Sequence, residues 1–268
     1  MKFSRQGLLF SLALAAPLLS APPQADAQDG GAANIQANIQ TADEQLLALA
    51  NQARAQVGAG RLQWDSALAA AALFHCRRMV VEGPIAHRYG GEPDLTDRAG
   101  QAGARFNLIE ENVAVGPSAA TIHEEWMNSA GHRANLLNPE IDHIGVAVVE
   151  SRGVLYAVAD YSHAVEPLTA SQVEARVAAL ITASGVSIVG DSSLARRACA
   201  SNEGAPRGPE GSMPGFVMRW QSPGLKELPK ALADRLATGR YRRAAVGSCP
   251  AQGLDGPFTA YRLAVLLY

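Results

Sequence analysis

The sequence lacks any apolar stretch long enough to cross a bilayer as a helix. A membrane-spanning helix needs about 20 apolar residues, and the last apolar run, Leu263 to Leu267, has only the length of a strand. The run Gly7 to Leu19 is also too short. It follows Lys2 and Arg5 and precedes Ala25-Asp26-Ala27, which is the pattern of a cleavable secretory signal.

We therefore predict that residues 1–27 are a signal peptide and that the mature protein is exported, either periplasmic or secreted. The alternative is an uncleaved anchor, which the 13-residue length of the run and Pro17 within it disfavour. After cleavage we expect no transmembrane anchor.

The chain also lacks a large excess of charge of one sign, with 23 Lys and Arg against 25 Asp and Glu. Residues 28–163 hold 9 basic and 16 acidic residues, a net charge of −7, and residues 164–268 hold 12 and 8, a net charge of +4. Neither value supports nucleic-acid binding. The asymmetry fits two solvated surfaces, mutual attraction of the halves, or affinity of the second half for an anionic surface.

Cysteine is scarce: the only three are Cys76, Cys199 and Cys249. Disulfides persist in the compartments to which exported proteins go, and Cys199 and Cys249 both lie in the C-terminal half. A bridge between these two is the economical pairing. Cys76 would then remain unpaired in an Ala-rich helical stretch, where a buried and inert thiol is expected.

Compact catalytic motifs are missing as well. His123 begins a helical turn but lacks the second histidine, four residues later, that a zinc-binding helix needs. Neither Ser118 nor Ser129 lies in the strained elbow of a serine nucleophile. Enzymatic activity is therefore uncertain and less favoured than a binding function.

Hydrophobic periodicity, caps and turn residues predict the local structure. Residues 28–40 are rich in Gly, Ala, Asn and Gln and are predicted to be a flexible linker. A capping box at Thr41 and Glu44 starts the first helix. Apolar spacing predicts helices over 41–57, 65–79, 96–105 and 119–128, and β-branched runs predict a hairpin of strands 144–149 and 154–158. Helices followed by a hairpin predict an α+β fold.

The remaining residues, 164–268, are predicted to form a small α+β module of unknown function. Its expected elements are helices over 169–182 and 226–237, a Gly/Pro-rich loop over 201–215, and a hairpin of strands 244–249 and 259–267. Arg240, Arg242 and Arg243 form its densest basic cluster, for which a solvated strand edge is favoured over contact with an anionic envelope.

Several motifs over residues 41–163 resemble the CAP superfamily of secreted proteins (cysteine-rich secretory proteins, antigen 5 and pathogenesis-related 1) in its compact bacterial form. They are Asn51-x-x-Arg54, Leu62-x-Trp64-Asp65, Ala86-His87-Arg88, Glu110-Glu111-Asn112, and Trp126 followed by Gly131-His132. The resemblance implies an α-β-α sandwich over these residues.

The resemblance also implies a cleft formed by His87, Glu111 and His132. Two departures from the family pattern stand out: Glu110 replaces a glycine, and Ser129 occupies the position of a second cleft acid. Supporting roles are expected for Asn112, Trp126, Arg133 and Asn135. Arg133, Asn135 and Asn138 are predicted to hold the loop after His132 by side-chain to backbone hydrogen bonds.

The other imidazoles are expected to have structural roles. We predict packing or a surface position for His75, an exposed or capping position for His123, and structural contacts for His143 and His163.

Three functions follow from these predictions. The leading hypothesis is a non-enzymatic exported CAP protein that binds a small ligand or a cell-envelope polymer in the His/Glu/His cleft. The second is a hydrolase of peptide or envelope substrates assisted by a divalent metal such as zinc, because two imidazoles and a carboxylate are a common zinc set. His87 and His132 would be metal ligands, with Glu111 as the third. The alternative role of Glu111 is to orient a histidine by a hydrogen bond. The third is an envelope adaptor that attaches through the basic C-terminal module. Sterol binding is not expected, because no aromatic residue separates Trp126 from His132.

Overall fold

The structure, a computed structural model, describes residues 41–201, 204, 206, 207 and 213–268. The predicted signal peptide and linker, residues 1–40, lie outside the described residues. Within the described part, no helix combines the length and the apolar character needed to cross a membrane.

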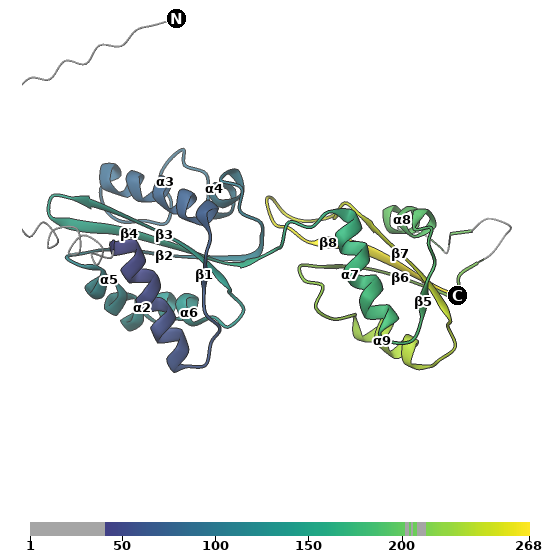
Figure 1. Ribbon diagram of the computed structural model, residues 1–268. Helices are drawn as coiled ribbons and strands as arrows, with labels where there is room; N and C mark the ends of the chain where they lie inside the picture. Colours follow the sequence, from purple (N-terminus) through teal and green to yellow (C-terminus); the bar gives the residue numbers. More distant parts are fainter. Residues whose placement is uncertain (1–40, 202–203, 205, 208–212) are drawn as a thin grey trace, which may run out of the picture. The chain divides into compact units, whose positions relative to one another are not determined.

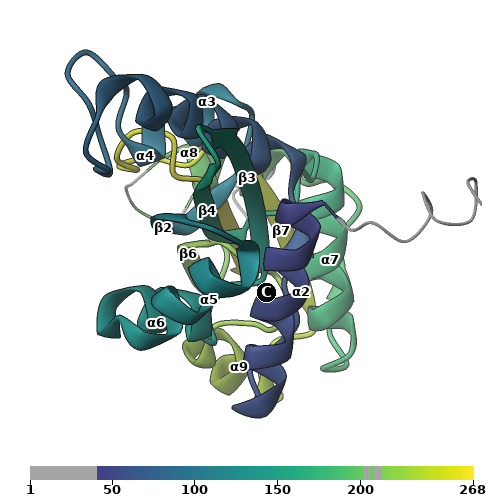
Figure 2. The same cartoon turned by 90° about the vertical axis from the view of Figure 1, so that its left-hand side faces the viewer.

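Residues 42–164 form a four-stranded sheet with helices on both faces (Figures 1 and 2). The strand order is β1-β3-β4-β2, with β1 parallel to β3 and the other pairs antiparallel. The strands are β1 (Gln63–Trp64), β2 (Phe106–Gly116), β3 (His143–Ser151) and β4 (Val154–Ala164). On one face lie α3 (Ser66–Glu82) and α4 (Leu95–Gln101), and on the other α2 (Ala42–Gln56), α5 (Ala119–Asn128) and α6 (Ala130–Leu137). The predicted α-β-α sandwich is confirmed.

Both faces of this sheet are buried because helices cover each of them. Successive strand residues point to opposite sides, so each strand contributes side chains to both hydrophobic layers. On β4, Ala159 and Tyr161 pack in the cluster that contains Trp126 of α5, whereas Val158 packs against Cys76 of α3. The Cys76 thiol is free and buried, as predicted. Asp65 starts α3 by accepting hydrogen bonds from two amides of the first turn, as its N-cap position predicts.

Two elements that carry site residues were not predicted. Strand β2 was missed because Glu110, Glu111 and Asn112 interrupt its apolar pattern. The segment after His132 was predicted to be a loop but is helix α6, since tertiary contacts override the weak helix propensity of Gly131 and its neighbours. The helix predicted over 96–105 is α4, which ends at Gln101 because Gly103 adopts a φ of 96° and turns the chain.

Residues 165–268 form a second four-stranded sheet, of order β5-β7-β8-β6. Helices α7 and α9 share one hydrophobic cluster with this sheet, and α8 shares another. The predicted α+β character is confirmed, as are the helix at 170–182 and the closing hairpin, whereas α8 and β6 were not predicted. The elements are α7 (Ala170–Thr182), β5 (Ser187–Ile188), α8 (Ser193–Ala200), β6 (Phe216–Ser222), α9 (Lys230–Ala237), β7 (Arg243–Cys249) and β8 (Tyr261–Leu267).

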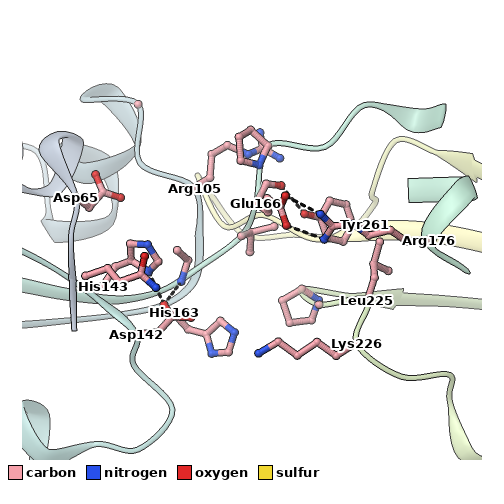
Figure 3. A pocket seen from close by; sticks show the side chains of 17 residues that line it. Asp65, Arg105, Asp142, His143, His163, Glu166, Arg176, Leu225, Lys226 and Tyr261 are labelled. Atoms are coloured by element: carbon pink, nitrogen blue, oxygen red, sulfur yellow. Dashed lines mark hydrogen bonds and ion pairs between the residues drawn. The ribbon is translucent and has the colours of Figure 1, made fainter. Parts of the chain in front are cut away.

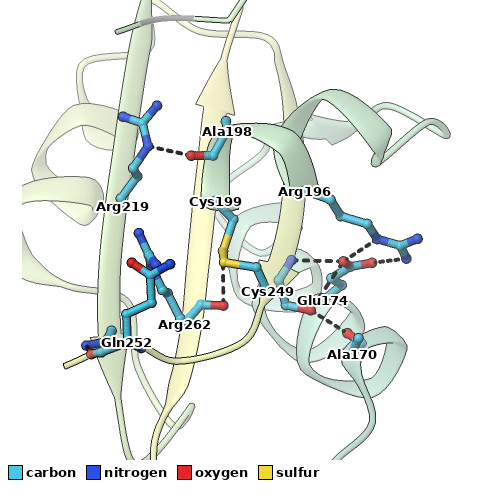
Figure 4. The surroundings of a disulfide bond; sticks show 11 residues. Ala170, Glu174, Arg196, Ala198, Cys199, Arg219, Cys249, Gln252 and Arg262 are labelled. Atoms are coloured by element: carbon cyan, nitrogen blue, oxygen red, sulfur yellow. Dashed lines mark hydrogen bonds and ion pairs between the residues drawn. A yellow bond between two sulfur atoms is a disulfide. The ribbon is translucent and has the colours of Figure 1, made fainter. Parts of the chain in front are cut away.

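A disulfide joins α8 to β7 in this second sheet (Figure 4). The predicted pairing of Cys199 with Cys249 is confirmed, with a Cα–Cα distance of 5.8 Å and 50 residues between them in sequence. Close by, the Glu174 carboxylate accepts two hydrogen bonds of 2.7 Å from Arg196 and one from the Ser248 amide. These contacts attach α7 to both α8 and β7.

Candidate functional site

Strand β2 positions Glu111 behind an exposed imidazole. The Glu111 side chain is 3% exposed, and its Oε1 lies 2.8 Å from Nδ1 of His87, whose side chain is 59% exposed. Because an ionised carboxylate can only accept, Nδ1 of His87 carries the hydrogen of this bond. The Nε2 edge of the ring is therefore left for a ligand.

Arg98 of α4 holds the other oxygen of the same carboxylate. Its guanidinium contacts Oε2 of Glu111 and is buried, with 1% of the side chain exposed. The same group donates to the backbone oxygens of His87 and Pro93, each at 3.3 Å. Arg98 therefore fixes both the acid and the segment that carries His87.

Asp160 of β4 lies directly opposite Glu111 in the sheet. It is fully buried, and among the described residues neither of its carboxylate oxygens has a hydrogen-bond partner. Burial and then the negative charge of Glu111 raise the pKa of Asp160 well above its ordinary value, against the opposing effect of Arg98. Asp160 therefore retains its proton to a higher pH than an ordinary aspartate.

His132 lies in the first turn of α6, close to His87. The two ring centroids are 6.4 Å apart, and the ring planes are inclined by 52°. Two predicted supporting residues attach this helix to β2. Asn112 donates to the backbone oxygen of His132 at 2.9 Å. Asn135 donates to the backbone oxygen of Glu111 at 3.1 Å and to the side-chain oxygen of Asn112 at 3.0 Å.

The two imidazoles differ in protonation. The hydrogen bond to Glu111 raises the pKa of His87, and this effect outweighs the opposing effect of burial. Burial, followed by the charge of His87, lowers the pKa of His132. As the pH falls toward the usual histidine range, His87 therefore takes up its proton first.

The other predicted residues have structural contacts. Trp126 is buried and donates from its indole nitrogen to Val113 of β2 at 3.2 Å, while Arg133 donates to the last turn of α5 at Met127. Glu110 accepts a hydrogen bond of 3.0 Å from Asn138, and burial raises its pKa. Ser129 joins α5 to α6 as the N-cap residue of α6.

Of the remaining imidazoles, two have the structural contacts predicted for them. His143 pairs with Asp142 at 2.7 Å in a pocket of about 570 Å³ (Figure 3), and His163 lies 2.7 Å from the Glu140 backbone oxygen. His123 was predicted to be exposed or capping. It is instead half-buried, and its Nδ1 has no hydrogen-bond partner in the described part of the chain.

A three-ligand metal set does not fit this geometry. Within the described residues, no group of three or more His, Cys, Asp and Glu side chains is arranged to hold a metal ion. Both Glu111 oxygens are engaged, one by His87 and one by Arg98. The groups that remain free to bind a metal ion at the surface are the two imidazoles.

Sequence reasoning missed Arg98 and Asp160. Arg98 gave no local signal, because its role depends on tertiary contacts with Glu111 and with the backbone of His87. The signal for Asp160 was weak but present: it is an acid within the otherwise apolar run 154–161. A charge at such a position needs a partner or a raised pKa.

The fold and the site together define a class: a four-stranded α-β-α sandwich in which a buried acid supports one of two neighbouring imidazoles. Residues 47–161 match the family model described as "CAP: Cysteine-rich secretory protein family". This part of the chain is a CAP domain.

The similarity to known proteins covers the same domain. The uncharacterized membrane protein YlbC of Bacillus subtilis (strain 168) is 36% identical over 115 residues, which cover 40% of this chain and 32% of that protein. The uncharacterized protein YkwD of the same organism is 31% identical over 121 residues, or 44% of this chain and 46% of that protein. Among solved structures, an extracellular protein containing a SCP domain from Bacillus anthracis str. Ames is 27% identical, with a TM-score of 0.43, over 45% of this chain and 40% of that chain. The chain thus spans less than half the length of these relatives.

Proposed function

We propose that this is an exported protein whose CAP domain binds a small ligand or a cell-envelope component, without catalysis, at the imidazole pair His87 and His132. The observation that carries the proposal is the support of His87. Its exposed ring is held from behind by the buried carboxylate of Glu111 at 2.8 Å. His132 lies beside it, with 6.4 Å between the ring centroids.

The protonation of this pair favours a ligand with an anionic or hydrogen-bond-accepting oxygen. His87, with its raised pKa, offers a charge-assisted donor at Nε2, and such hydrogen bonds are about twice as strong as neutral ones. Carboxylate-bearing peptidoglycan fragments have this chemistry. Because the segment carrying His87 is already fixed by Arg98, little ordering cost remains to be met on binding.

Calorimetry of the full chain with soluble peptidoglycan fragments tests this proposal. We expect His87→Ala and His132→Ala each to weaken binding by about 10-fold or more, the equivalent of about 1.4 kcal/mol. His163→Ala is the matched control, because it removes a half-buried imidazole outside the site. Equal affinity of the double variant His87→Ala/His132→Ala and the unmodified protein would refute the proposal.

Export rests on the predicted signal peptide and on the Cys199–Cys249 disulfide, which suits an oxidising compartment. N-terminal sequencing of the protein recovered outside the cytoplasm should give a mature terminus near residue 28. A protein retained inside the cell with its first residues intact would contradict this expectation.

Binding of a divalent metal such as zinc is the second candidate, favoured by one feature. A carboxylate that holds one nitrogen of an imidazole is the usual support of a metal-binding histidine. Since a ligating imidazole must be neutral, affinity should rise with pH through the raised pKa of His87. A zinc titration that shows no dependence on His87 or His132 would remove this candidate.

A further inference from the structure

A buried histidine–glutamate pair lies beneath the segment that carries His87. His75 of α3 and Glu92 both have fully buried side chains, and Nδ1 of His75 lies 2.7 Å from Oε1 of Glu92. The other ring nitrogen of His75 lies 2.8 Å from the backbone oxygen of Ala86. That carbonyl can only accept, so Nε2 carries a hydrogen and the orientation of the ring is determined.

The same pair fastens the chain on both sides of His87. Oε2 of Glu92 accepts a hydrogen bond of 2.9 Å from the Tyr89 amide, and Arg88 donates to the Glu92 backbone oxygen at 2.8 Å. The chain from Ala86 to Glu92 has neither helix nor strand. Its conformation therefore depends on these side-chain contacts.

Arg98 connects this pair to the site acid. Its Nη1 lies 3.9 Å from Oε1 of Glu92 and donates to the His87 backbone oxygen, while its Nη2 contacts Glu111. A continuous buried polar chain thus runs from His75 through Glu92 and Arg98 to Glu111, which bonds the His87 ring.

We propose that His75 and Glu92 are positioning residues that hold the His87 ring against Glu111. A binding site keeps its geometry only when buried neighbours fix the rotamers and the backbone of the residues that contact the ligand. The proposal rests on the proposed function in so far as His87 is taken as the ligand contact, but its geometric part is independent of any ligand.

NMR of the ligand-free full chain tests the positioning role. In the unmodified protein we expect a protected Nδ1 proton on His87 and slow exchange of the Tyr89 amide. In His75→Ala and Glu92→Gln the His87 signal should be lost, and exchange at Tyr89 should be faster by about 10-fold or more. Glu92→Gln retains the side-chain volume and supplies the result if His75→Ala does not fold.

Cys76→Ala is the matched control. It alters the neighbouring buried residue of α3, whose thiol faces Tyr156 of β4, so it should destabilise the domain without changing either signal. Unchanged His87 and Tyr89 signals in Glu92→Gln would overturn the positioning role. If the unmodified protein shows both signals but binds no peptidoglycan fragment, the proposed function fails while the positioning role stands.

A second, independent observation concerns the two sheets, which have one topology. Each begins with a helix and a two-residue strand, and the order of strands is β1-β3-β4-β2 in one and β5-β7-β8-β6 in the other. In each, the two-residue strand is parallel to its neighbour and the remaining pairs are antiparallel.

A glycine occupies the equivalent position in the two sheets. A Cβ on Gly145 of β3 would lie 2.0 Å from the Ala69 nitrogen of α3, and a Cβ on Gly247 of β7 would lie 2.2 Å from the Arg196 nitrogen of α8. Each glycine thus allows the helix backbone to touch the sheet.

When the two sheets are superimposed on these glycines, the residues paired across the first sheet can be compared with those paired across the second. The first row contains Asp160 opposite Glu111, and the second contains Ala264 opposite Arg219. We infer that residues 165–268 are a second, divergent copy of the CAP fold, in which arginine and alanine have replaced the two acids of the site. The buried carboxylate that supports an imidazole, Glu111 behind His87, therefore belongs to the first copy and has no counterpart at Arg219 in the second.

NMR of the full chain also tests this inference. It should detect a parallel β5–β7 pair in which the Val189 amide bonds the Ala244 carbonyl, as the 2.8 Å contact requires. Gly247→Ala should lower the midpoint of thermal unfolding by about 5 °C or more, whereas Gly190→Ala, which meets nothing within 4 Å, should not. An antiparallel or unpaired β5, or a neutral Gly247→Ala, would overturn the inference.

Discussion

At the scale of single residues, the site depends on charges removed from water and on the groups that compensate them. Glu111 is buried but receives hydrogen bonds from His87 and Arg98, so its charge is paired. Asp160, opposite it, has no such partner among the described residues. Removing an unpaired carboxylate from water is costly, and the group responds by retaining its proton.

Asp160→Asn should therefore change how stability depends on pH. A carboxyl whose pKa is raised on folding contributes stability that is complete below its unfolded pKa, near 3.8, and is lost as pH rises through the folded value. Asparagine does not titrate. We expect the variant to lose less stability than the unmodified protein between about pH 4 and pH 7, as measured by urea unfolding at several pH values. Parallel pH profiles would contradict the assignment.

His87, Glu111 and His132 could be brought forward from sequence as candidate site residues because each lies in a short motif, in the order of the family pattern. The position of Glu111 behind His87 could not be predicted. It results from the burial of β2 between two layers of helices, and from Arg98, 13 residues before Glu111 in the sequence, and Asp160, 49 residues after it.

At the scale of elements, helix α6, which carries His132, depends on a side chain from another helix. Arg54 of α2 is fully buried and donates to the carbonyl oxygens of Leu136, Asn138 and Ile141 at 2.8–2.9 Å. These oxygens lie at and beyond the end of α6, where no helical amide satisfies them. The helix that presents His132 is thereby attached to α2.

Arg54→Ala should destabilise the domain by about 3 kcal/mol or more, because it leaves several buried carbonyls without donors. Urea unfolding followed by tryptophan fluorescence measures this loss. Arg61→Ala, at an exposed position in the following turn, is the control and should change stability by less than about 0.5 kcal/mol. Equal stabilities of the two variants would show that Arg54 does not support α6.

At the scale of the whole molecule, the described part of the chain contains two sheets of the same topology, and the first of them belongs to the CAP domain. The second contains the disulfide, which joins Cys199 to Cys249 across 50 residues. A cross-link of this span stabilises a fold mainly by restricting the unfolded chain.

Replacing both bridged cysteines by alanine should cost about 2–4 kcal/mol. The loss should appear in the transition that unfolds residues 165–268, followed by urea unfolding with tryptophan fluorescence from Trp220. Cys76→Ala removes the free thiol and should leave that transition unchanged. An unaltered midpoint in the double variant would show that the bridge contributes little.

The sequence by itself determined the α+β class, the paired cysteines, the major helices and the order of the motifs that carry the candidate site residues. Periodicity, caps and motif spacing are local and can be read along the chain. Only the tertiary structure decided that Glu111 supports His87 from behind, that His75 and Arg98 belong to the same polar chain, that Asp160 lies opposite Glu111, and that residues 165–268 repeat the topology of the first sheet. These features arise from strand order and burial, which bring distant residues together and which no local pattern specifies.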